Sequence, residues 1–108
     1  MEHTSYMNTI REFEEALLFA RTAEAAVISL SLNLEIIEGN ITRAETQGDH
    51  RYLRQLLWDK DRDSEALLTW TQRLIEGRTF LVEAISMRAL GGRLLPAEIV
   101  RWIVDLLL

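Results

Sequence analysis

The chain has 108 residues, 48% of them hydrophobic and 27% charged, with 17 acidic and 12 basic side chains and a formal net charge of −5. Such an apolar fraction can support a folded core, which excludes general disorder, and the length favours a single domain, residues 1–108. The sequence contains no cysteine, which excludes a disulfide scaffold, a thiolate zinc site and a cysteine nucleophile.

The N-terminal region lacks the pattern of a secretory signal, so we expect a cytoplasmic protein. The longest uncharged run, residues 25–34, is shorter than the about 20 apolar residues that cross a bilayer, and we therefore expect no membrane span. Two histidines are too few for a His-rich metal cluster, and no glycine-rich phosphate-binding loop is present. We expect no metal and no cofactor.

Residues 9–38 are predicted to form the first helix. Thr9 and Glu12 have the spacing of a capping box, apolar residues then recur at helical intervals, and Gly39 with Asn40 would end the helix. Residues 27–36 also alternate between apolar and polar, as in a strand. Because no second strand pattern exists to pair with it, a helix is favoured.

A second helical pattern follows a polar segment in which Gly48 breaks the chain and Asp49 can cap the next helix. Its apolar residues share one side from 53 to 82, but the charged segment 58–64 interrupts that side. The segment either kinks the helix or separates two helices, and we favour a restart near Asp61. No internal repeat or heptad array is apparent.

Gly91 and Gly92 are predicted to end this element, and Pro96 suits the first position of a last helix. The predicted fold is all-α: a bundle of three or four helices built on a long helical hairpin, and dimeric.

Two segments carry more apolar surface than one small chain can cover. Residues 16–37 are apolar nearly all the way round as a helix, and 96–108 have only a narrow charged stripe. Residues 16–37 are expected to be buried against a second protomer or a partner. For residues 96–108, core packing within a dimer is the favoured explanation, followed by a groove on a foreign partner and then by a membrane surface. The predicted interface residues are Phe19, Ile28, Leu32, Trp102, Ile103 and Leu106.

We therefore expect a homodimeric interaction protein that binds a protein partner, not an enzyme: an inhibitor, an adaptor or a chaperone-like factor. Its small size and its ratio of eleven arginines to one lysine would fit a gene from a virus or phage.

An arginine face supports an alternative, the binding of duplex RNA. Arg51, Arg54, Arg62 and Arg73 share one side if residues 50–76 form one helix, at a spacing that could meet successive backbone crossings. Glu65 follows Arg62 by three residues, as is typical of a solvated salt-bridge surface, and the net acidity also opposes this interpretation.

The plan of a helical hairpin followed by short helices resembles the dimeric double-stranded-RNA binders with which small RNA viruses suppress silencing. Arg51-Tyr52-Leu53 with Leu56, and later Leu74 and Glu76, are similar to the second helix of that family. The similarity covers about a third of the chain and implies binding of duplex RNA by that helix.

A third hypothesis is a ribonuclease. Arg43, His50 and Tyr52 resemble the R-x(4–6)-H and H-x-Y elements of the helical HEPN ribonucleases, in which the His and Arg meet across a dimer to act on an RNA 2′-hydroxyl. The sequence departs from that pattern, because Ala44 replaces the usual polar residue and Gly48 interrupts the helix that the motif normally begins.

Overall fold

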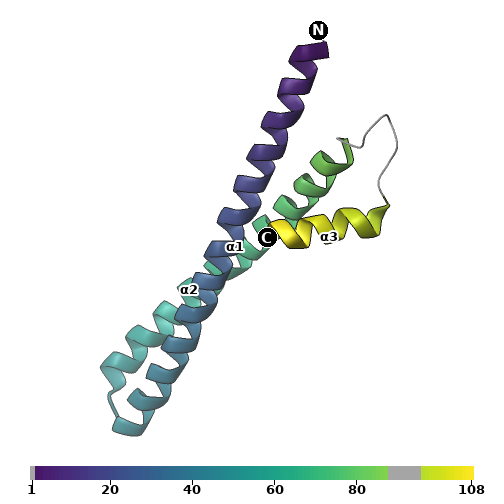
Figure 1. The fold of residues 1–108 in the computed structure, drawn as a ribbon. Helices are drawn as coiled ribbons and strands as arrows, with labels where there is room; N and C mark the ends of the chain where they lie inside the picture. Colours follow the sequence, from purple (N-terminus) through teal and green to yellow (C-terminus); the bar gives the residue numbers. More distant parts are fainter. Residues whose placement is uncertain (1, 88–95) are drawn as a thin grey trace. The chain divides into compact units, whose positions relative to one another are not determined.

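The computed structural model describes residues 2–87 and 96–108, which form three helices: α1 (Glu2–Gln47), α2 (His50–Met87) and α3 (Ala97–Leu107) (Figure 1). This confirms an all-helical chain with a long hairpin of α1 and α2. The predicted stop at Gly91 and Gly92 lies outside the described residues. The dimer stays a prediction.

Helix α1 extends beyond both predicted ends. It begins at Glu2 rather than Thr9, and it continues through Gly39 to Gln47. The expected end at Gly39 is wrong because Ile41 and Ala44 supply further inward-facing side chains, the second of them buried, and packing overrides the weak helix propensity of one glycine. The strand-like alternation of residues 27–36 also lies in this helix.

The turn between α1 and α2 follows the prediction. Gly48 has a positive φ of 70°, the left-handed conformation that favours glycine after a helix. The amide of Asp49 donates to the Ala44 carbonyl over 3.0 Å, and the Tyr52 amide donates to Asp49 Oδ1 over 3.1 Å. Asp49 is therefore the N-cap of α2.

Helix α2 is continuous, so the predicted restart near Asp61 is wrong. Local pairs hold the charged segment in the helix: Gln55 Nε2 donates to Asp59 Oδ1 over 3.2 Å, and Arg62 lies 3.6 Å from Asp59 and 3.4 Å from Asp63. In α3, Pro96 is the N-cap and not the predicted first helical residue, because the helix begins one residue later at Ala97.

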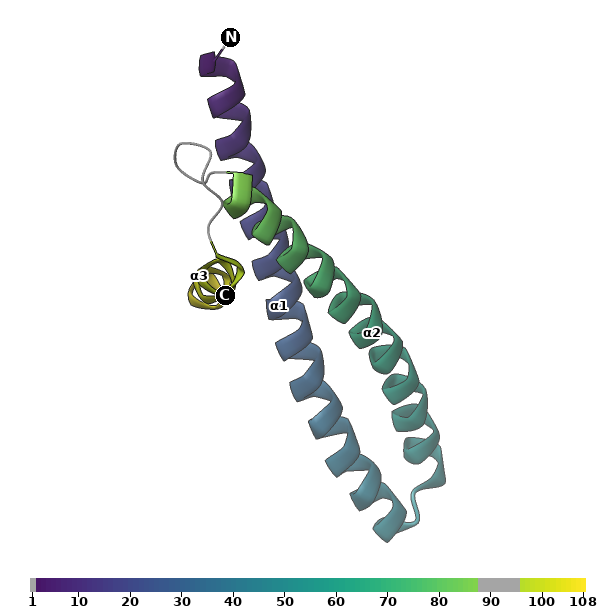
Figure 2. The ribbon, with the colours of Figure 1, turned by 90° about the vertical axis from the view of Figure 1, so that its right-hand side faces the viewer.

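The described chain divides into two compact units. The hairpin unit, Ala25–Thr71, holds the second half of α1, the turn and the first half of α2, which run antiparallel and side by side (Figure 2). The terminal unit, Met1–Glu24 with Gln72–Leu108, holds the other halves and α3.

In the core of the terminal unit, α2 and α3 each contribute two buried residues that lie one helical turn apart, and α1 contributes a buried alanine. Leu81 and Ile85 of α2 are buried against Ala16 of α1, and Val100 and Val104 of α3 complete the cluster. Additional buried alanines on α1, Ala20 and Ala23, let the helices approach closely. Gly77 of α2 lies so near to them that a Cβ there would be 3.0 Å from Ala20 Cα.

The hairpin unit packs along a heptad seam that the sequence analysis missed. On α1 the inward, buried or half-buried residues alternate at intervals of three and four: Val27, Leu30, Leu34, Ile37, Ile41 and Ala44. On α2 they do the same: Leu53, Leu56, Lys60, Asp63, Leu67 and Trp70. This spacing is that of a coiled-coil seam. Lys60 and Asp63 occupy two of its positions with charged side chains, but the intervals of three and four residues continue through them.

Candidate functional site

A row of exposed apolar side chains runs along α1 in the hairpin unit. Ile28, Leu32 and Ile36 are 54%, 55% and 62% exposed, and Ala25 lies on the same side. We call these four residues the α1 stripe. Because the seam residues of α1 already pack toward α2, the stripe is a second apolar face of the same helix. No charged residue belongs to it.

A second row lies on α3 in the terminal unit. Ile99, Trp102 and Leu106 are 44%, 64% and 68% exposed at intervals of three and four residues, and we call them the α3 stripe. The other side of α3 is buried through Val100 and Val104.

Two polar contacts hold α3 in this orientation. Arg78 Nη2 of α2 lies 2.6 Å from Asp105 Oδ1, and Arg21 Nε of α1 donates to the Leu107 carbonyl over 3.2 Å. Helix α3 therefore presents its stripe to solvent while its opposite side completes the core.

Four of the six predicted interface residues are exposed in these two rows: Ile28, Leu32, Trp102 and Leu106. The other two have partners within the chain. Phe19 makes an edge-on contact with Phe80, with ring centroids 6.1 Å apart, and Ile103 packs against the core of the terminal unit.

Ile36 and Ile99 were not among the predicted interface residues, although their spacing from Leu32 and Trp102 places them in the same rows. Ile36 lies one helical turn after Leu32, and Ile99 lies nearly one turn before Trp102. A pattern search that followed the exposed side of each helix would have found both.

The predicted arginine face is divided between the two units. Arg51, Arg54 and Arg62 lie in the hairpin unit and Arg73 in the terminal unit, and all four are exposed. Arg62 stacks on Trp58, with its guanidinium carbon 5.3 Å from the ring centroid, and pairs with Asp59 and Asp63. The predicted condition that one helix carries all four arginines is met by α2.

The HEPN-like residues lie on both sides of the turn. Arg43 is exposed near the end of α1, and His50 and Tyr52 are exposed in the first turn of α2. Gly48 separates them, so the motif does not begin a helix in the way that the HEPN pattern requires. Among the described residues, no group of three or more His, Asp or Glu side chains is arranged to hold a metal ion.

Helix α1 bears on the membrane prediction. Between Arg11 and Gln47 it is long and apolar enough, by length and composition alone, to cross a bilayer, and 11% of the apolar window is buried. Core helices of soluble proteins and signal sequences meet the same criterion. The uncharged run of residues 25–34 is short, but the apolar part of α1 is longer than that run because isolated charged residues lie within it. The absence of a membrane span stays a prediction.

No protein-family model, curated protein or solved structure matches this chain.

Proposed function

We propose that the protein acts as a homodimer that binds a protein partner, with the α1 stripe as the dimer contact and the α3 stripe as the partner surface. The observation that carries the proposal is the exposure of the α1 stripe on a helix whose opposite side already packs on α2. A helix that is apolar on two opposite sides gains stability when a second surface covers the free side.

The chemistry of the α1 stripe favours a second copy of the chain as the occupant. The stripe carries no charge, so two copies can meet along a two-fold axis without like-charge repulsion. Burying each of the half-exposed Ile and Leu side chains contributes on the order of 1 kcal/mol, and a symmetric contact counts every residue twice.

The α3 stripe suits a groove on a foreign protein. Its residues, Ile99, Trp102 and Leu106, have the spacing of anchors that an amphipathic helix inserts into a hydrophobic groove. Trp102 has the large, mostly exposed ring that dominates many such interfaces.

The dimer is tested by Leu32→Glu, with Asn33→Glu as its control. Asn33 is the exposed neighbouring residue on α1 and lies off the stripe. Light scattering should give the mass of a dimer for the unmodified chain and for the control. For Leu32→Glu we expect the dissociation constant of the dimer to rise at least about tenfold. A monomeric unmodified chain, or a Leu32→Glu variant that dimerises normally, would contradict the dimer contact.

The partner surface is tested by Trp102→Asp, with Arg101→Asp as its control. Arg101 is the exposed neighbour on α3. Cross-linking in a lysate should yield a protein adduct that the control retains and Trp102→Asp loses. Adducts that are the same in both variants would exclude the α3 stripe as the partner surface.

Duplex RNA is a second candidate ligand, supported by the continuity of α2 and by the exposure of Arg51 and Arg54 on it. Counterion release would make such binding fall steeply with salt. A gel shift at low salt should disappear in Arg51→Glu with Arg54→Glu and persist in Glu65→Gln. If no shift occurs at low salt, the RNA hypothesis is wrong.

A further inference from the structure

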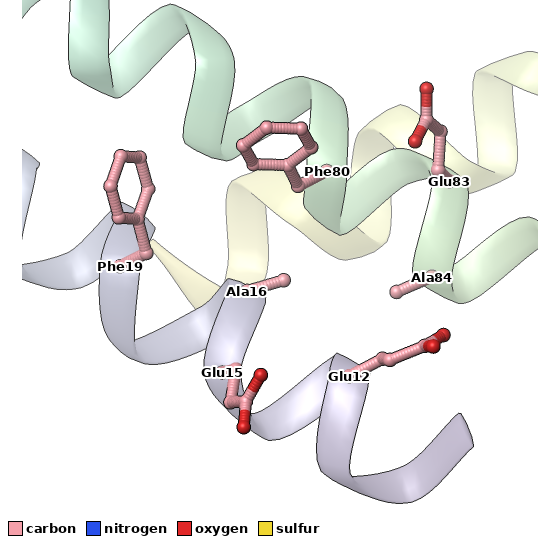
Figure 3. A pocket seen from close by; sticks show the side chains of 7 residues that line it. All are labelled: Glu12, Glu15, Ala16, Phe19, Phe80, Glu83 and Ala84. Atoms are coloured by element: carbon pink, nitrogen blue, oxygen red, sulfur yellow. The ribbon is translucent and has the colours of Figure 1, made fainter. Parts of the chain in front are cut away.

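A cavity of about 360 Å³ opens between α1 and α2 of the terminal unit. Figure 3 shows its apolar floor, formed by the rings of Phe19 and Phe80 with the methyl groups of two alanines. Its volume lies in the range of small-ligand sites. Phe19 and Phe80 are 38% and 50% exposed as residues, so the floor is open to a ligand.

The floor is held in place by the packing of the helices. Phe19 and Phe80 meet edge to face at an interplanar angle of 64°, the favoured arrangement for an aromatic pair. Gly77, on the preceding turn of α2, leaves the space that Phe19 occupies, since a Cβ there would be 2.9 Å from Phe19 Cδ1. The aromatic surface is therefore largely preformed.

The charged residues that line this cavity are all carboxylates: Glu12, Glu15 and Glu83. In Figure 3, Glu12 and Glu15 project from α1 and Glu83 from α2 around the edge of the aromatic floor, and the carboxylates of Glu15 and Glu83 point away from the rings. A cation placed over the rings would gain from the ring quadrupoles and from the negative potential of the three carboxylates around the cavity.

We propose that this cavity binds a small organic cation, an ammonium ion with an aromatic or branched alkyl group. The apolar group would cover Phe19 and Phe80, and the charge would face the glutamates. An anion of the same shape would be repelled, and a metal ion would leave the apolar floor unused. The proposal concerns the terminal unit alone and does not depend on the dimer or on the α3 stripe.

The test uses benzyltriethylammonium as the probe and benzenesulfonate as its anionic counterpart, each titrated into the isotope-labelled full chain. For a probe with about 14 non-hydrogen atoms we expect a Kd of about 1 mM. Amide shifts should concentrate around residues 12–19 and 80–84, and added salt should weaken binding. If the sulfonate binds equally well, or if the cation does not bind, the proposal is wrong.

Two sets of variants locate the site. Replacing Glu12, Glu15 and Glu83 by Gln together should weaken cation binding about tenfold, since three carboxylates are neutralised. The matched triple variant, with Glu14, Glu24 and Glu35 replaced by Gln, makes the same change in net charge at residues that do not line the cavity, and it should bind normally. If both triple variants bind the cation more weakly to the same extent, the effect is one of net charge alone and the proposed site is wrong.

Phe80→Leu tests the aromatic floor. It keeps an apolar side chain but removes the ring, and we expect the cation to bind about threefold more weakly. The helical circular dichroism of each variant is recorded beside the titration. A folded Phe80→Leu chain that binds the cation as well as the unmodified protein would exclude the aromatic contribution.

Discussion

The substitution Gly77→Ala tests a close approach of the two long helices in the terminal unit. In an exposed helix interior, replacing Gly by Ala stabilises by about 1 kcal/mol, because Ala has the higher helix propensity. At Gly77 the new methyl group would lie 2.9 Å from Phe19 Cδ1, 3.0 Å from Ala20 Cα and 3.1 Å from Ala20 Cβ. The Phe19 ring can turn away, but Ala20 Cα belongs to the backbone, so the helices must separate.

Overpacking of this kind costs about 1–3 kcal/mol, which exceeds the gain in propensity. We expect Gly77→Ala to lower the free energy of unfolding by about 1 kcal/mol net. Gly39→Ala is the matched control, because Gly39 lies inside α1 with nothing within 4 Å of its added Cβ. The control should be stabilised by about 0.5–1 kcal/mol.

Urea denaturation of both variants measures whether the free energy of unfolding falls in Gly77→Ala and rises in Gly39→Ala. Both are made in the Leu32→Glu background, so that any dimerisation along α1 does not enter the measured stability. If Gly77→Ala is stabilised as much as Gly39→Ala, the helices are not in close contact at Ala20 and the packing of the terminal unit described here is wrong.

Three further predictions concern the turn, the core and the seam. Gly48→Ala should cost about 1 kcal/mol, because its φ of 70° is unfavourable for other residues; an unchanged urea midpoint would contradict the left-handed turn. Leu81→Ala, at a fully buried site, should cost about 3 kcal/mol, whereas Leu68→Ala, at a site 73% exposed, should change the stability by less than about 0.5 kcal/mol, both measured by urea unfolding. Lys60→Leu should raise the thermal midpoint, since Lys60 holds a seam position and its 3.6 Å pair with Glu38 joins side chains that are 42% and 63% exposed; a lower midpoint would show that the ion pair stabilises the hairpin more than apolar packing would.

The fold class followed from the sequence because local signals and apolar periodicity agree there. The break at Gly48 and the cap at Asp49 were predicted from their side chains, and the structure has both, although the first helix was expected to end earlier, near Gly39. The bounds of the helices were less accurate where local signals compete with packing. Gly39 and the charged segment around Asp61 look like helix ends locally, and both lie inside long helices whose inward residues pack on a neighbour.

The seam was missed because its residues are not all apolar. Lys60 and Asp63 hold inward positions of the seam in α2. A search for hydrophobic heptads therefore finds gaps, although the intervals of three and four continue through them. The cavity was also beyond the sequence, because Phe19 and Phe80 are far apart in the chain and meet only through the pairing of the helices.

The two apolar sides of α1 in the hairpin unit bear on the function more than any single residue does. One side, the seam, packs on α2, and the other, the α1 stripe, is exposed at Ile28, Leu32 and Ile36. An exposed Leu or Ile by itself needs no explanation, since much of any protein surface is apolar. A charge-free row of them at helical spacing is different, because contiguous apolar surface of this kind marks interaction sites. The mass of the chain in solution, with and without Leu32→Glu, therefore decides whether this helix is half of a dimer.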